Sequence, residues 1–162
     1  MAQVYHYYME VEETKLKFDC VVDLDRHHLI PKFLLFYAGE FLEDLKQQFR
    51  EYGNIDFAII HKDLPDEERN LIFNDFHNGS IQAIIIHGHI EHDFSTFPVV
   101  INFDLPSNID RYIYQVRNIQ PTNKIAINLV TEDELAALME FGTENDIDFI
   151  EQPKNSNDFQ RN

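Results

Sequence analysis

The chain has 162 residues, which is enough for one domain with a full hydrophobic core. Because 44% of its residues are hydrophobic and 13% are aromatic, the composition predicts a folded globule and excludes a disordered chain. Thirteen lysines and arginines against 29 aspartates and glutamates give a formal net charge of −16, which disfavours autonomous nucleic-acid binding, since phosphate recognition depends on basic side chains.

Apolar runs alternate with amphipathic segments along the whole chain. Alternating or continuous apolar residues predict strands at residues 4–11, 33–37, 57–60, 81–86, 99–103 and 124–130. Apolar residues at helical spacing predict helices at residues 13–24, 39–52, 63–78, 108–117 and 132–141. The third helix has a strong start, because Pro65 fits a first helical turn and the acids beside it face the positive end of the helix dipole.

Strands that alternate with helices at this spacing indicate a parallel sheet. We therefore expect an α/β fold with a doubly wound, mainly parallel sheet flanked by helices. Residues 1–152 are expected to form this single domain, and the polar residues 153–162 a frayed tail. No apolar run approaches the roughly 20 residues that cross a bilayer, so no membrane association is expected. The single cysteine, Cys20, excludes an internal disulfide framework and suits a reducing compartment; the expected location is the cytoplasm, with the nucleus as the alternative.

Two segments carry a family resemblance. Residues 60–69 read I-H-K-D-L-P-D-E-E-R, and residues 101–106 read I-N-F-D-L-P. They are similar to h-H-G-D-M-P-Q-x-E-R and V-I-N-Y-D-L-P in the second RecA-like domain of DEAD-box RNA helicases, in the branch of translation initiation factor four-A. The similarity spans nearly the whole chain. It implies a RecA-like fold and a role in RNA biology.

The nucleotide motifs of that family are degenerate in this chain. Where the family reads S-T-D-x-x-A-R-G-I-D, residues 87–93 form a shorter segment, and only Asp93 matches the closing aspartate. Where the family reads Y-I-H-R-I-G-R-x-G-R, neutral Gln115 and Asn118 replace arginines that clamp the ATP phosphates. Pro121 stands at the position of the outer arginine finger, and Arg117 takes the place of a glycine.

These losses predict that the chain is a helicase-derived pseudoenzyme rather than an enzyme. An arginine finger contributes about 10³–10⁵ in the rate of phosphoryl transfer, and glutamine or asparagine cannot supply its charge. The sequence also has no G-x-x-x-x-G-K-[S/T] loop and no D-E-A-D segment, so this chain alone lacks a complete ATP site. No cofactor is expected.

Residual RNA binding is an alternative function. Lys62, Arg69 and His77 are the candidate contacts with an RNA backbone, together with main-chain amides. His77 stands in a turn where the family often carries a permanent cation. We therefore expect RNA binding to be weak or absent.

A histidine cluster offers a more remote alternative. His87, His89 and His92 are spaced so that they could surround zinc or nickel, which would suit a metal-dependent enzyme. The spacing matches no established zinc pattern, however. A polar surface loop that replaces a decayed nucleotide motif is the favoured interpretation, and no metal is expected.

The favoured function is therefore protein interaction. We expect an inactive helicase-like domain that binds a protein partner or self-associates, in an assembly for RNA processing, a small-RNA pathway or translation. Tyr5, His6, Tyr7 and Tyr8 could form an exposed aromatic stripe that supports a homodimer, although ordinary packing under helices explains the same residues.

Overall fold

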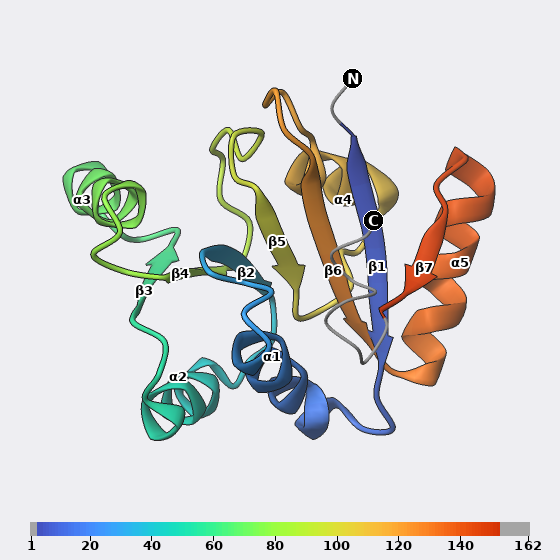
Figure 1. The fold of residues 1–162 in the computed structure, drawn as a ribbon, viewed down its shortest axis with the longest axis horizontal. Coiled ribbons are helices and arrows are strands. Elements are labelled where there is room, and N and C mark those ends of the chain that lie inside the picture. Colours follow the sequence, from blue (N-terminus) through green and yellow to red (C-terminus); the bar gives the residue numbers. More distant parts are fainter. Residues whose placement is uncertain (1–2, 153–162) are drawn as a thin grey trace.

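One parallel sheet organises residues 3–152, the part of the chain that the computed structural model describes (Figure 1). The strand order is β3-β4-β2-β5-β6-β1-β7, and every neighbouring pair is parallel. The elements are β1 (Val4–Glu10), a 3₁₀ turn (Thr14–Leu16), α1 (Lys17–Arg26), β2 (Phe33–Tyr37), α2 (Leu42–Tyr52), β3 (Phe57–His61), α3 (Asp66–His77), β4 (Ala83–His87), β5 (Val99–Asn102), α4 (Ile109–Val116), β6 (Lys124–Val130), α5 (Glu132–Asn145) and β7 (Phe149–Glu151). The doubly wound parallel α/β fold expected from the sequence is confirmed.

Helices bury both faces of the central strands. All five residues of β2 are buried, which explains its unbroken apolar sequence. Phe33 and Leu35 belong to one core cluster, with side chains of α1 and α2. Leu34 and Phe36 belong to another, with side chains of α3 and Tyr114 of α4. The loops at the ends of these strands therefore extend from a sheet that is covered on both faces.

Helix boundaries differ from the predictions where local hydrogen bonds intervene. The helix expected from residue 39 begins at Leu42, because the Tyr37 hydroxyl accepts a hydrogen bond from the Phe41 amide and holds the turn before it. Pro65 precedes α3 as its N-cap residue and does not lie in the first turn. The last helix runs past residue 141 and ends beside Asp146, whose backbone is left-handed with φ of 54°.

The sequence did not predict β7, which lies beside β1 and pairs with it in parallel. Gly142 allows β7 to approach α5, because a Cβ at this position would meet the Ile147 carbonyl oxygen at 2.5 Å. Strand β1 is consequently an interior strand, bonded to β6 on one side and to β7 on the other.

This arrangement corrects the expectation of an exposed aromatic stripe at Tyr5, His6, Tyr7 and Tyr8. Tyr7 is only 1% exposed and belongs to the core, whereas the other three side chains are half-buried. The period-two pattern correctly predicted the strand β1, but it does not reveal that β6 and β7 cover the two edges of this strand. The predicted frayed tail, residues 153–162, lies outside the described residues. Within the described part, no helix is long and apolar enough to span a membrane.

A buried polar chain connects β5, β6, α4 and β1. Asn102 donates to Asn128 at 2.9 Å, and Asn128 donates to the Tyr112 hydroxyl at 3.1 Å. The same hydroxyl lies 2.8 Å from Nδ1 of His6. Burial lowers the pKa of His6 to about 4, so the folded protein holds this imidazole neutral.

Acid should therefore destabilise the protein through His6. In the unfolded chain His6 becomes protonated as the pH falls below the ordinary histidine pKa of 6.5, whereas in the folded chain it stays neutral until about pH 4. Between these two pH values the unfolded chain binds more protons, so the free energy of unfolding decreases as the pH falls. Between pH 7 and about pH 4.5, we expect this one group to remove roughly 2–3 kcal/mol from the free energy of unfolding. Urea unfolding of wild type and His6→Phe at both pH values measures how much of the change in the free energy of unfolding disappears with the imidazole. The control His89→Phe, at an exposed position, should keep the wild-type pH dependence.

Candidate functional site

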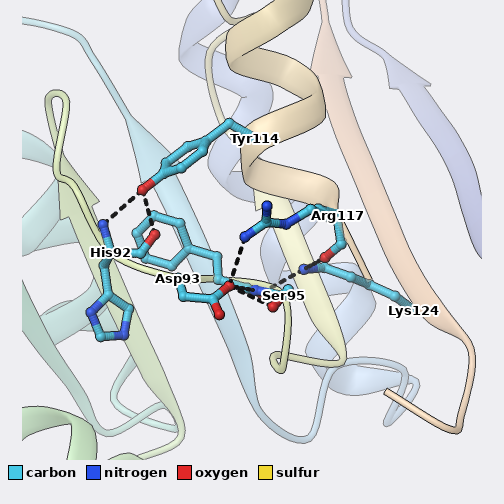
Figure 2. A network of polar contacts seen from close by, with 7 residues as sticks. His92, Asp93, Ser95, Tyr114, Arg117 and Lys124 are labelled. Atoms are coloured by element: carbon cyan, nitrogen blue, oxygen red, sulfur yellow. Dashed lines mark hydrogen bonds and ion pairs between the residues drawn. The ribbon is translucent and has the colours of Figure 1, made fainter. Parts of the chain in front are cut away.

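The two degenerate nucleotide segments contact each other beside α4. Arg117, just after this helix, places Nη2 3.1 Å from Oδ1 of Asp93 in the loop between β4 and β5. The same Asp93 oxygen accepts hydrogen bonds from the amide and the hydroxyl of Ser95 (Figure 2). The Ser95 hydrogen bonds, followed by Arg117, lower the pKa of Asp93 to about 2. The carboxylate is therefore fixed in its charged form and already partnered.

Tyr114 anchors the same loop one turn earlier on α4. Its hydroxyl accepts a hydrogen bond from the His92 amide at 2.8 Å and donates one to the His92 carbonyl. This tyrosine stands where the helicase motif has a histidine. It serves here as a clamp on the main chain of the loop.

Lys124 connects the loop after β4 to the segment after α4. It is the first residue of β6 and is fully buried, and its ammonium donates to the carbonyls of Phe94 at 2.7 Å and Arg117 at 2.9 Å. Burial lowers the pKa of Lys124 to about 8, a shift that Arg117 favours and Asp93 opposes. Sequence reasoning missed Lys124 and Ser95. A lysine at the start of an otherwise apolar strand was the available signal, because such a charge needs buried partners.

The other substituted motif positions are neutral and serve local structure. Gln115 is 6% exposed and lines a cavity of about 170 Å³ with Asp104 and Arg111; its Oε1 has no hydrogen-bond partner among the described residues. Asn118 holds its own loop, accepting from the Gln120 amide and donating to the Thr122 carbonyl, both at 3.0 Å. Pro121 is exposed.

The three histidines of the loop have separate environments. His87 places Nε2 3.0 Å from the Gly39 carbonyl oxygen, and the ring of His92 stacks on Phe73 with centroids 4.1 Å apart. His89 is exposed. Burial lowers the pKa of His92, and the charge of Arg69 adds to this effect. Across residues 3–152, no three histidine, cysteine or acidic side chains converge on a metal position.

The RNA-contact candidates are spread along α3. Lys62 is exposed before the helix, and His77 stacks on Phe97 at its end. Arg69 lies between them, with Nη1 3.9 Å from Asp66 and a buried Nε that lacks a partner within the described part of the chain. Arg69 and His77 are eight residues apart, or about 12 Å along the helix axis, so the three do not form one cluster.

The parallel sheet, with its two loop segments meeting beside α4, defines a RecA-like helicase domain. The structure of the C-terminal domain of the DEAD-box protein Dbp5 superposes with a TM-score of 0.83 at 20% identity, covering 99% of this chain and 98% of that one. The S. cerevisiae Dbp5 C-terminal domain bound to Gle1 and IP6 superposes with a TM-score of 0.81 at 21% identity, covering 98% and 97%.

The sequence comparison is more specific. The family described as "Helicase conserved C-terminal domain" matches residues 16–117, and the chain belongs to this family. It is 34% identical over 139 residues to the ATP-dependent RNA helicase eIF4A of Kluyveromyces lactis. That alignment covers 83% of this chain and 35% of the relative, so the chain spans about a third of the helicase it matches. The resemblance to a DEAD-box C-terminal domain is confirmed.

Replacing Lys124 by methionine tests the link between the two segments. The substitution keeps the side-chain length but removes the donor to two carbonyl oxygens, so we expect the free energy of unfolding to fall by about 2 kcal/mol. Urea unfolding measures this loss. The control Lys62→Met, at an exposed position, should stay within about 0.5 kcal/mol of wild type. Equal effects of the two substitutions would contradict a structural role for the buried ammonium.

Proposed function

We propose that this chain is a non-catalytic, helicase-derived domain that works by binding a protein partner. The observation that carries the proposal is the ion pair between Asp93 and Arg117. These residues stand in the two segments that contact nucleotide in active members of the family. Here Arg117 is paired with a carboxylate of its own chain, which reduces the positive charge that it presents to a phosphate.

The surrounding positions support the same conclusion. Transfer of a phosphoryl group requires positive charge where the transition state becomes negative. Gln115 is neutral and buried in α4, and Asn118 is committed to its own loop. The chain as a whole carries a formal net charge of −16, which disfavours binding of both ATP and RNA.

A protein partner fits this surface better than a second copy does. The Dbp5 C-terminal domain, which shares the fold, binds Gle1 in one solved complex, so the scaffold is compatible with protein docking. Self-association loses its main argument, since Tyr7 is buried and β1 is interior. Kinship with an RNA helicase favours an assembly for RNA processing, a small-RNA pathway or translation, in the cytoplasm or the nucleus.

The proposal predicts no saturable RNA binding. Fluorescence anisotropy of a labelled single-stranded oligouridylate, titrated with the full chain at low salt, measures it under the conditions that favour electrostatic binding. We expect no saturation across about 1–100 µM protein, the range in which non-specific nucleic-acid binding normally appears.

The alternative of residual RNA binding makes the opposite prediction. Saturation that disappears with added salt and is weakened by Lys62→Ala would overturn the proposal, because Lys62 is an exposed candidate contact. Lys15→Ala is the matched control, since it removes one charge from an exposed lysine that lies outside α3, the loop after β4 and the segment after α4.

A further inference from the structure

A cleft of about 810 Å³ lies away from the nucleotide segments, between the carboxyl end of β1, helix α1 and the end of β7. Its apolar lining comes from β1, the turn after it and α1. The residues are Met9, Val11, Leu16, Cys20 and Leu24, and Leu29 after α1 completes the apolar lining. A cleft of this size with an apolar floor can enclose one or two large side chains of a ligand.

Acidic side chains surround this floor. Six of them line the cleft, all exposed and carried by several elements: Glu10, Glu12, Asp19, Asp23, Glu132 and Glu151. No lysine or arginine belongs to the described lining, and the one histidine, His27, directs its Nδ1 to the Asp23 carbonyl. Like charges gathered around one cleft repel each other, and a cationic ligand would relieve that repulsion.

The distribution of the acids selects the kind of ligand. Asp19 and Asp23 are one turn apart on α1, while Glu132 begins α5 and Glu151 ends β7. A single small cation cannot neutralise carboxylates on so many elements. An extended chain with an apolar centre and cations on both sides can reach them together. A second copy of this protein is a poor occupant, because two chains of charge −16 repel.

We propose that this cleft binds a basic peptide segment of a partner protein, with a leucine or phenylalanine on the floor and flanking lysines or arginines against the acidic rim. This inference rests on the proposed function as a protein-binding domain, and it adds the surface and the chemistry of the partner. Salt weakens the rim contacts and leaves the apolar contact, so affinity falls with ionic strength without vanishing.

Methyl NMR of methionine-labelled full chain tests the location. The probe is a synthetic peptide with a Leu-Phe-Leu centre flanked by Lys and Arg on each side. The chain has three methionines; Met9 lines the cleft, whereas Met139 lies on α5 outside it. We expect the Met9 methyl signal to shift saturably while the Met139 signal stays, and a peptide with Glu at every basic position to shift neither.

Charge reversal on the rim tests the chemistry. Glu12→Lys combined with Asp19→Lys should weaken binding of the basic peptide at least about tenfold. Glu140→Lys combined with Glu144→Lys makes the same change in net charge on exposed α5 positions outside the cleft, and should alter affinity much less. Equal weakening by both pairs would overturn the proposal, because it would reduce the effect to net charge.

Two other outcomes would also overturn it. One is the absence of any Met9 shift with the basic peptide. The other is binding that appears only after residues 153–162 are deleted, which would make the chain's own end the occupant. Either result leaves the RNA titration unchanged, so failure of this cleft is distinguishable from the saturable RNA binding that would overturn the proposed function.

Discussion

The buried ammonium of Lys124 links the two segments of the candidate site. By holding the Phe94 and Arg117 carbonyls together, it joins the loop after β4 to the segment after α4. Once these backbones are adjacent, the Arg117 side chain reaches Asp93, and Tyr114 closes the loop from α4. A desolvated charge is costly unless it is fully hydrogen-bonded, which makes this arrangement specific as well as stable.

The fold persists because its core does not depend on the nucleotide segments. Strands β2 and β4 are buried on both faces by apolar side chains, and helices on each side complete the two main clusters. Loops at the edge of such a sheet can exchange arginine for neutral residues without losing core contacts. Hydrophobic burial therefore maintains the RecA-like architecture independently of the residues in the two loop segments.

The sequence predicted what depends on local pattern. The sequence correctly predicted the strands at residues 33–37 and 124–130, because runs of mainly apolar residues are typical of buried strands. The three-residue β7 was missed because it is too short and too exposed to show an apolar run. The substitutions at Gln115 and Asn118 could be read from the family motif. The pair of Asp93 with Arg117 could not, since it joins residues 24 apart through packing that no periodicity encodes.

The local engagement of Asn118 has an evolutionary consequence. Four hydrogen bonds tie this side chain to the carbonyls of Gln3 and Thr122 and to the main-chain and side-chain amides of Gln120, so an arginine there would first release the loop. An arginine at Gln115 would have to enter a position that is almost fully buried. Each single substitution to arginine is therefore expected to cost stability before its guanidinium could contact a phosphate. Under the proposed non-catalytic function, a return to phosphate binding would therefore need several substitutions together rather than one at a time.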